Sequence, residues 1–325
     1  MRVLMTGATG FVGGHLAEHL LAAGDIVIGL SGSGRWPEGL QFLAQDVRLE
    51  RCDLADGDSE ELGELIARKQ PEVIYHLAAQ SNPQQSVTDP RGTWALNLGG
   101  TLNLLEAVRG AKSTAKVIIV SSGVCYGSPA PEFLPVTEAC PLRPNNPYSA
   151  SKGAADLLGI QYVLGYGLDV VMARPFNHAG PRQSDTYALS SFARQVAEIE
   201  VGLRPRIEVG NLNVTRDFTD VRDIVAAYRL LATRGKAGEI YNIGTGRDIS
   251  LKRMLDILKD QSSATVEIYV DPTRVRPVDQ PLLLADASKL RAETGWEPRF
   301  TIEQTLQDML DYWRKQVKVL APVGG

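Results

Sequence analysis

Cysteine and histidine are scarce in this 325-residue sequence. Cys52, Cys125 and Cys140 are an odd number with no CxxC pair, which argues against a disulfide framework or a zinc site and favours a reducing compartment. We therefore expect a cytoplasmic protein. Of the four histidines, only His15 and His19 share a helical face, and no third ligand lies near them, so we expect no metal site.

Long apolar runs and a strong net charge are also missing. No apolar stretch approaches the roughly 18 residues that a membrane-spanning helix needs, and the start MRVLMTGATG is too short an apolar run for a signal peptide. A net charge of −4 gives no reason to bind nucleic acid or an anionic membrane, so neither is an expected partner. An anionic ligand would have to be held by local arginines.

Short apolar runs alternate with amphipathic stretches through the first half of the chain. RVLMTG, DIVIGL and PEVIYHLAA have the pattern of strands separated by helices, which builds a parallel sheet covered on both faces. We predict an α/β, Rossmann-like doubly wound fold with residues 1–175 as the dinucleotide-binding domain. Residues 176–325 should form mainly a smaller, mixed α/β substrate-binding domain, with segments near 214–245 returning to the first.

The stretch TGATGFVG lies between the first strand and the first helix, with its glycines spaced GxxGxxG. Glycine lets the backbone turn tightly and approach a pyrophosphate, which then rests on the positive end of the helix. Because the glycines follow a strand directly and precede an amphipathic helix, they favour a dinucleotide site over a merely structural turn. The expected contacts are Gly7, Thr9, Gly10, Phe11 and Val12.

The end of the second strand bears on the choice of cofactor. A dinucleotide fold that prefers NAD usually places an Asp or Glu there, but this sequence continues Ser31-Gly32-Ser33-Gly34-Arg35. Without the acid nothing repels a 2′-phosphate, and Ser31 and Arg35 could bind one. NADP(H) is therefore the preferred cofactor, and NAD(H) stays possible. Asp53, after the third strand, either contacts the adenine amino group or caps a helix.

A tyrosine and a lysine stand four residues apart in YSASK, on one face of a predicted helix. A lysine beside a phenol favours the phenolate, so we expect Lys152 to lower the pKa of Tyr148 from its usual value near 10 and make it an acid or base close to neutrality. Ser122, at the strand end in VSSGVCYG, could hydrogen-bond the same substrate oxygen.

Five motifs occur in an order and spacing that resemble the extended short-chain dehydrogenase/reductases: TGATGFVG, HLAA at 76–79, ALNLGGTLNLLEA with Asn97, SSGVCYG and YSASK. The resemblance covers nearly the whole chain. It implies a seven-stranded parallel sheet and a catalytic triad of Ser122, Tyr148 and Lys152, with Lys152 also holding the nicotinamide ribose. It implies further cofactor contacts from Leu54, Leu77, Ala78, Ala79 and Pro175.

The same resemblance implies the partners. A homodimer would form when the helices near 97–110 and 148–166 of two subunits pack into a four-helix bundle. The smaller domain would hold a nucleotide-diphosphate sugar. The likeness assigns the diphosphate to Arg216 in VTRDFTD and Arg276 in RVRPVDQ, a ribose hydroxyl to Asp279, and a phosphate or sugar contact to Asn177. Taken singly, each of these residues could be an ordinary surface residue.

Three reactions compete. A 4,6-dehydratase needs an additional carboxylate, and that subfamily places a Glu where this sequence has Val124, followed by Cys125. Neither residue can do the acid-base work of elimination, which disfavours dehydration. The 4-epimerases use the same triad with tightly bound NAD. In that subfamily the second strand typically ends in an acidic residue, whereas this sequence has Ser31 there. A 4-epimerase stays open as the alternative.

Net reduction of a 4-keto sugar is the third reaction. RPFNHAGPRQ, IEVGNLNVTRDFTDVRD and DPTRVRPVDQ resemble the reductases that act on GDP-4-keto-6-deoxy-D-mannose, and the guanine preference comes from that resemblance alone. In this reading NADPH gives hydride to carbon 4 while Tyr148 donates a proton to its oxygen. A sensor that binds dinucleotide without chemistry is a further possibility, but its mark would be a broken Tyr–Lys pair, and this pair is intact.

Overall fold

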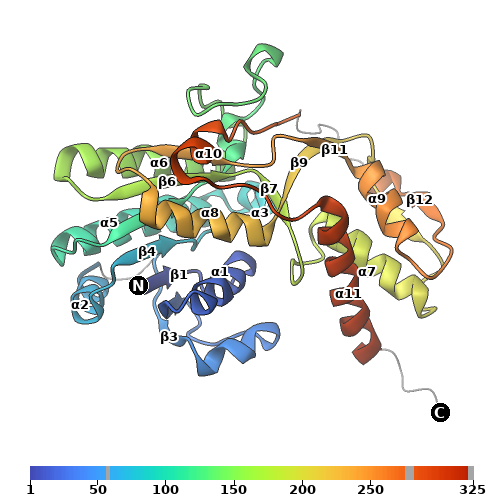
Figure 1. Ribbon diagram of the computed structural model, residues 1–325, viewed down its shortest axis with the longest axis horizontal. Coiled ribbons are helices and arrows are strands. Elements are labelled where there is room, and N and C mark those ends of the chain that lie inside the picture. The colour runs from blue at the N-terminus through green and yellow to red at the C-terminus, as the bar shows by residue number, and fades with distance from the viewer. Residues whose placement is uncertain (56–58, 275–281, 321–325) are drawn as a thin grey trace.

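A seven-stranded parallel sheet forms the centre of the larger of two units (Figure 1). The structure is a computed structural model, and it describes residues 1–55, 59–274 and 282–320. The strands are β1 (Arg2–Thr6), β2 (Ile26–Ser31), β3 (Arg48–Arg51), β4 (Val73–His76), β5 (Lys116–Val120), β6 (Val170–Pro175) and β10 (Ile240–Ile243). Their order is β10-β6-β5-β4-β1-β2-β3. The order reverses between β1 and β4, which opens a crevice at the carboxyl ends of the strands. The predicted α/β, doubly wound fold is confirmed.

Helices cover both faces of this sheet. They are α1 (Phe11–Ala22), α2 (Ser59–Lys69), α5 (Gly100–Gly110), α6 (Pro147–Tyr166) and α8 (Val221–Arg234). Successive strand residues face opposite sides: Val3 and Met5 pack in the core formed with α1 and α8, and Leu4 packs in the core formed with α2, α5 and α6. Because both faces are buried, the inner strands are mainly apolar, as a parallel sheet requires, whereas the edge strand β3 is charged and partly exposed.

The stretch before α5 is helical in short pieces. It comprises α3 (Pro83–Thr88), α4 (Pro90–Trp94) and a π-helical turn (Ala95–Gly99). Short 3-10 helices occupy Glu38–Gln45, Gly123–Tyr126, Pro131–Phe133 and Pro272–Arg274. Asn97 lies in the π-helical turn and is buried, which brings its side chain to the loop that follows β4.

A second, smaller unit is built from the later part of the chain. Its elements are α7 (Ala188–Glu200), β8 (Ile207–Val209), α9 (Leu251–Asp260), β12 (Ile268–Val270) and α11 (Ile302–Leu320). Apolar residues of α7, α9 and α11 share one core with those of β8, and Figure 1 shows these helices at the opposite side of the molecule from α2 and α5.

A three-stranded sheet stands between the two units in the view of Figure 1. It contains β7 (Asn177–Ala179), β9 (Thr215–Asp220) and β11 (Asp248–Ser250), and α10 (Ser288–Thr294) packs beside β10. After β9, the chain crosses back to the large sheet as α8 and β10, and β10 pairs with β6. Of the segment expected to return near 214–245, β9 itself pairs with β7 and β11 instead.

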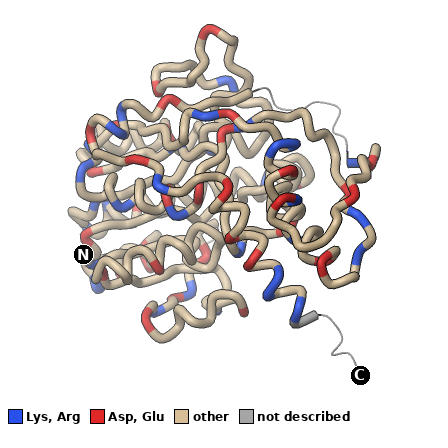
Figure 2. Tube along the Cα trace, turned by 45° about the vertical axis from the view of Figure 1, so that its right-hand side comes forward, with Lys and Arg blue, Asp and Glu red and all other residues tan. Residues whose placement is uncertain are grey.

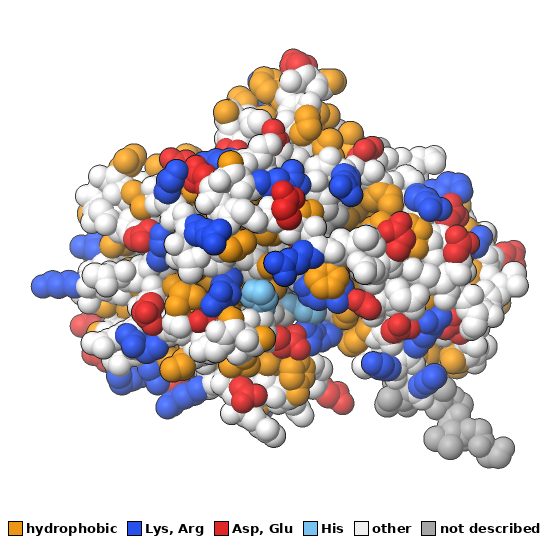
Figure 3. Space-filling view, viewed as in Figure 1, with side chains coloured by type: hydrophobic (Ala, Val, Ile, Leu, Met, Phe, Trp, Pro, Cys, Tyr) orange, Lys and Arg blue, Asp and Glu red, His pale blue; other side chains and the backbone are white. Residues whose placement is uncertain are grey.

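Charged side chains are mixed rather than gathered by sign. Figure 2 shows positive and negative residues interspersed along the trace, and the face drawn in Figure 3 also carries both signs, with hydrophobic side chains in scattered groups. Among the residues that the structure describes, no helix combines the length and apolar character that crossing a membrane requires.

An ion pair joins α7 to α11. Arg314 Nη2 donates to Glu200 Oε1 at 2.7 Å and Arg314 Nε donates to Oε2 at 2.8 Å. Burial by itself raises the pKa of Glu200, but hydrogen bonds from Arg314, from the backbone of Ser263 and from Ser262 lower it to about 2. In the unfolded chain the pKa of Glu200 has its usual value of 4.5. Ionised Glu200 therefore stabilises the folded protein relative to the unfolded chain.

We predict that Glu200→Gln lowers the free energy of unfolding at pH 7 by about 3 kcal/mol, the value of lowering a pKa from 4.5 to about 2. Because the folded pKa is depressed, the wild-type advantage is present above pH 4.5 and fades as pH falls towards 2. Urea unfolding of both proteins between pH 3 and 7 measures the difference. Glu303→Gln, at an exposed position of α11, is the control, and a pH-independent difference for Glu200→Gln would contradict the assignment.

Candidate active site

A cleft of about 1550 Å³ lies at the carboxyl end of the large sheet and extends to the second unit. The predicted site residues that line it are Gly7, Thr9, Gly10, Phe11, Val12, Ser31, Asp53, Leu54, Leu77, Ala78, Ala79, Ser122, Tyr148, Lys152, Pro175, Asn177 and Arg216. Arg35 is exposed and is not part of the lining. Arg276 and Asp279 lie outside the described residues. One cleft thus collects residues from distant parts of the chain.

The glycine loop leaves no room for side chains. Gly7 has a φ of +67°, and a Cβ there would lie 2.7 Å from the backbone nitrogen of Ala78. A Cβ on Gly13 would lie 2.3 Å from the carbonyl oxygen of Gly7. Gly10 caps α1 with an extended backbone and has no side chain to bind the first N–H groups of the helix. Those groups suit a pyrophosphate, so the loop fits a dinucleotide.

The adenosine end of the cleft is formed by the ends of β2 and β3. Ser31 is buried, and its hydroxyl accepts a hydrogen bond from Gly34 N at 3.0 Å. This tight turn carries the chain past the cleft before Arg35, so the role of Arg35 stays a prediction. Arg51 stands opposite Ser31 in the register of β2 and β3, but it is exposed and, like Arg35, is not part of the lining. Asp53 Oδ1 accepts from Ala55 N at 3.0 Å.

The catalytic helix starts at a capping box. Asn146 Oδ1 accepts from Ser149 N at 2.9 Å, and Ser149 Oγ accepts from Asn146 N at 3.2 Å. The box sets the start of α6 so that Tyr148 lies in its first turn and Lys152 one turn later. Tyr148 and Lys152 lie on one helix, as predicted, and both line the same cleft as Ser122.

Lys152 ties α6 to the end of β5. Its Nζ donates to Val120 O at 2.7 Å, and Ser121 Oγ donates to Lys152 O at 3.1 Å. Burial lowers the pKa of Lys152 to about 8, although the charge of Asp156 opposes the change. The ammonium is therefore close to its titration point near neutral pH.

The expected effect of Lys152 on Tyr148 is wrong in the structure. Burial raises the pKa of Tyr148 to about 12, and the group that lowers it is Ser122, through a hydrogen bond. The reason is that the free-energy cost of removing a phenolate from water exceeds the stabilisation that the hydrogen bond with Ser122 gives it. Tyr148 is thus a neutral phenol at pH 7, the form that can donate a proton.

A chain of buried polar groups supports the floor of the cleft. Thr101 Oγ1 donates to Asn97 O at 2.6 Å, so it accepts from His76 Nε2 at 2.9 Å. His76 Nδ1 then accepts from Thr6 Oγ1 at 2.9 Å, and Thr6 Oγ1 accepts from Ala78 N at 3.1 Å. Burial, and then the charge of Lys152, lower the pKa of His76 to about 3. The ring is neutral, which this arrangement requires.

Asn97 holds together two parts of the site. Its Oδ1 accepts from Gln80 N at 2.8 Å, and its Nδ2 donates to Gln80 O at 3.1 Å and to Ser151 Oγ at 2.9 Å. Gln80 belongs to the loop after β4, and Ser151 precedes Lys152 on α6. The loop and the catalytic helix therefore keep one relative position.

The small three-stranded sheet presents Asn177 and Arg216 to the cleft from the neighbouring strands β7 and β9. Arg216 Nη1 donates to Thr215 O at 2.8 Å, and Asn177 Nδ2 donates to Asp217 O at 3.4 Å. The buried Asp217 carboxylate accepts from Thr245 Oγ1 at 2.6 Å and from backbone N–H groups, including Ala285 N at 3.1 Å. It fixes β9 and so the place of Arg216.

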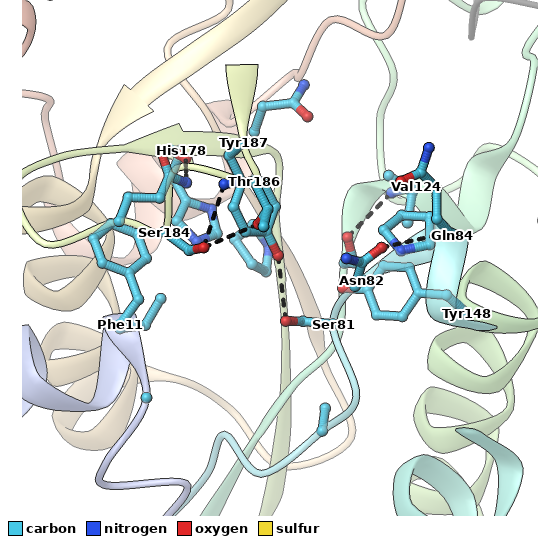
Figure 4. A pocket seen from close by; sticks show the side chains of 18 of the residues that line it. Phe11, Ser81, Asn82, Gln84, Val124, Tyr148, His178, Ser184, Thr186 and Tyr187 are labelled. Carbon is cyan, nitrogen blue, oxygen red and sulfur yellow. Dashed lines mark hydrogen bonds between the residues drawn. The ribbon is translucent and has the colours of Figure 1, made fainter. Parts of the chain in front are cut away.

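Sequence reasoning missed contacts from the far side of the cleft. Tyr187, at the start of α7, approaches Ser81, from the loop after β4, with 3.5 Å between their hydroxyl oxygens (Figure 4). Arg274 also lines the cleft and donates to Glu208 O and Glu208 Oε2, each at 3.1 Å. No sequence motif marks Tyr187, whereas Arg274 lies in the DPTRVRPVDQ segment from which Arg276 was chosen.

Val124 occupies the position at which a dehydratase would carry its Glu. It lines the cleft, and Figure 4 shows it on the same side as Tyr148. Its backbone N–H donates to Ser122 Oγ at 3.4 Å. An apolar side chain therefore stands beside the hydroxyl groups of the site where elimination of water would need an acid or base.

Comparison with known proteins finds likeness along nearly the whole chain. The family described as GDP-mannose 4,6 dehydratase matches residues 4–309. The GDP-6-deoxy-D-mannose reductase of Pseudomonas aeruginosa is 37% identical over 318 residues, which covers 98% of this chain and 98% of that protein.

Solved structures give the same fold with either nicotinamide cofactor. The structure of RMD from Pseudomonas aeruginosa complexed with NADPH has a TM-score of 0.85 at 35% identity, covering 97% of this chain and 99% of that one. The UDP-glucose 4-epimerase of Thermus thermophilus in complex with NAD has a TM-score of 0.85 at 32% identity, with the same coverage. The fold alone therefore does not select between reduction and epimerisation.

We predict that Gly13→Ala weakens NADPH binding by about tenfold or more, because the backbone oxygens facing the new Cβ cannot move without distorting the loop, at a cost of about 1–3 kcal/mol. Fluorescence titration with NADPH measures the loss. Gly110→Ala is the matched control, since nothing lies within 4 Å of its added Cβ. Equal NADPH affinity in both variants would show that the loop does not carry the dinucleotide.

Proposed function

The chain belongs to the GDP-mannose 4,6 dehydratase family, within the extended short-chain dehydrogenase/reductases, and on this basis we propose that it reduces GDP-4-keto-6-deoxy-D-mannose to GDP-6-deoxy-D-mannose (GDP-D-rhamnose). The observation that carries the proposal is a cleft with Ser122, Tyr148 and Lys152 and, beside them, Val124 in place of a dehydratase acid. The likeness to the Pseudomonas reductase supports it.

The cofactor of this reaction is NADPH by preference, with NADH possible. When bound, it supplies the hydride that reduces carbon 4. The glycine loop would hold its pyrophosphate, and the absence of an acid at Ser31 leaves room for a 2′-phosphate. Arg35 and Arg51 are the guanidinium groups nearest in sequence and register to that position. The NADPH complex of a relative at 35% identity supports this preference.

Tyr148 is the proton donor. Its pKa of about 12 keeps the phenol protonated at neutral pH, so it can pass the proton to the oxygen that gains charge at carbon 4. Ser122 shares a hydrogen bond with Tyr148 and would orient the same oxygen. The Lys152 ammonium stabilises the phenolate that is left. Because the pKa of Lys152 is about 8, this stabilisation weakens as the pH rises above that value.

The nucleotide diphosphate lies towards the second unit. Arg216 would pair with the diphosphate and Asn177 with a phosphate or the sugar, from their neighbouring strands. Arg276 and Asp279 lie outside the described residues, and their predicted roles stay predictions. Binding energy gained at this end aligns carbon 4 with the hydride donor, although the groups that gain it stand far from the reacting atoms.

The protein acts as a homodimer through a four-helix bundle. Leu157 and Leu164, seven residues apart on α6, are 62% and 82% exposed, and Leu102 on the neighbouring α5 is 41% exposed. Leucines at this spacing form the stripe by which helices pair. A location in the cytoplasm is part of the same proposal and is supported by the three free thiols.

Turnover of GDP-4-keto-6-deoxy-D-mannose with NADPH, and separately with NADH, tests the function. We expect one NADPH oxidised for each GDP-6-deoxy-D-mannose formed, and Tyr148→Phe should lower kcat by about 10²–10⁴ with little change in NADPH affinity, because only the proton donor is lost. Product identification by mass spectrometry and NMR completes the measurement.

Two results would decide against this function. If neither cofactor is oxidised by the wild-type protein, it is not this reductase. If UDP-glucose is converted to its 4-epimer without added reductant, the protein is an epimerase with retained NAD, which is the alternative that the shared fold leaves open.

We predict that Leu164→Asp converts the dimer to a monomer, because it places a charge in the apolar stripe, where the bundle would remove that charge from water. Sedimentation velocity gives the mass directly. Leu203→Asp is the control, since Leu203 is 51% exposed but belongs to the turn after α7. A wild-type protein that sediments as a monomer would refute the bundle.

A further inference from the structure

A buried carboxylate lies one helical turn beyond Lys152. Asp156 has no exposed surface, and its Oδ2 accepts a hydrogen bond from Arg174 Nε at 2.7 Å. Its Oδ1 is buried and has no partner at standard hydrogen-bond geometry among the described residues, although the Ser121 hydroxyl lies near the carboxyl group and lowers its pKa. Residues at i and i+4 of a helix are neighbours on one face, so Asp156 is the next side chain along the face that presents Lys152. Nothing in the proposed reaction uses it directly.

We propose that Asp156 is a positioning residue, whose carboxylate keeps the ammonium of Lys152 charged and in place at the end of β5. The inference rests on the proposed function for the role of Lys152, and on the geometry for everything else. Arg174 compensates the buried carboxylate directly, and the charge of Lys152 acts on the same carboxylate in the same direction.

The surroundings of Lys152 make this carboxylate decisive. Lys152 is 7% exposed, so its charge loses most of its contact with water. Electrostatic interactions link Lys152 to Asp156 on the same helix and to His76 at the end of β4. Tyr148 lies one turn before Lys152 on α6, and Arg174 of β6 pairs with Asp156. Tyr148 and His76 are neutral at pH 7, because burial raises the first pKa and lowers the second. Val120, the last residue of β5, contributes the carbonyl oxygen that binds Nζ, and the following Ser121 donates its hydroxyl to the Lys152 carbonyl oxygen. Asp156 is thus the negative charge within this described set.

A buried hydrogen-bond chain holds the carboxylate where it is. Arg174 Nη1 donates to Tyr126 OH at 2.7 Å, and Tyr126 OH donates to Asn242 Oδ1 at 2.8 Å. Asn242 Nδ2 in turn donates to Val136 O at 2.9 Å. Burial is the largest effect and raises the pKa of Asp156, while the charge and hydrogen bond of Arg174 oppose it. The guanidinium does not lose its proton in this range, so its contact with Oδ2 at 2.7 Å favours the ionised carboxylate.

The consequence concerns the alkaline side of the pH profile. Lys152 must be charged to stabilise the Tyr148 phenolate, and a neighbouring carboxylate raises the pKa at which that charge is lost. Without the charge of Asp156, the pKa of Lys152 should fall below its wild-type value of about 8. Activity should then be lost at a lower pH, while activity at acidic pH is less affected.

Asp156→Asn tests the proposal, with the Lys152 titration followed by NMR in protein labelled with [ε-13C]lysine. The Lys152 signal is assigned by its loss in Lys152→Met. We expect the midpoint, about 8 in the wild type, to fall by about one pH unit or more. The alkaline limb of kcat should move by the same amount, and Asp156→Glu should restore most of both.

Two further variants separate charge from structure. Tyr126→Phe removes a hydroxyl from the same buried chain and leaves both charges, so its Lys152 midpoint should equal that of the wild type. Asp156→Leu combined with Arg174→Met removes the ion pair without leaving an unpaired buried charge, and it keeps the test readable if Asp156→Asn does not fold. The midpoint should fall in this double variant also, because Asp156, and not Arg174, is the charge that raises the pKa of Lys152.

An unchanged Lys152 midpoint in folded Asp156→Asn, or in the double variant, would overturn the proposal. The NMR titration needs no sugar substrate, so its outcome does not depend on the identity of the reaction. Failure of the wild-type protein to turn over GDP-4-keto-6-deoxy-D-mannose would count against the proposed function alone.

Discussion

The burial of a lysine ammonium at the carboxyl end of β5 is the constraint on which the catalytic end of this molecule depends. Lys152 can lie there because Val120 O accepts from its Nζ at 2.7 Å and because Asp156 lies one turn away. The same burial lowers the pKa of Lys152 and raises that of Tyr148. Both effects come from the cost of removing charge from water, and they leave a neutral phenol beside a cation at neutral pH.

The second requirement is that the two units meet over this place. The chain leaves the large sheet after β6, forms β7 and β9, and returns as α8 and β10. Asp217 anchors the crossing, because its carboxylate accepts from Thr245 and from Ala285 N, which belong to separate segments. Arg216 is its neighbour on β9, so the anchoring of the backbone also places a guanidinium at the cleft, at a distance from Tyr148 that local sequence cannot set.

Local patterns were sufficient for the elements and for much of the site. The glycine spacing, the strand-end serine and the Tyr–Lys spacing each depend on a few adjacent residues and one element type, so they predicted groups that line one cleft. The expected pKa of Tyr148 was wrong because it was argued from one neighbour, whereas burial by the whole surrounding core decides it. Tyr187 was missed because its approach to Ser81 depends on the packing of segments far apart in the chain.

The sequence by itself determined the alternation of strands and helices and the glycine spacing of the first loop, which follow from residue type and short-range spacing. The resemblance to a known family added the meaning of Val124, the position at which a dehydratase carries its acid. Only the tertiary structure decided the ionisation of Tyr148 and Lys152, the pairing of Asp156 with Arg174, and the approach of Tyr187 to Ser81. Those properties depend on desolvation and on distances between segments far apart in the chain, and neither exists until the two units have packed.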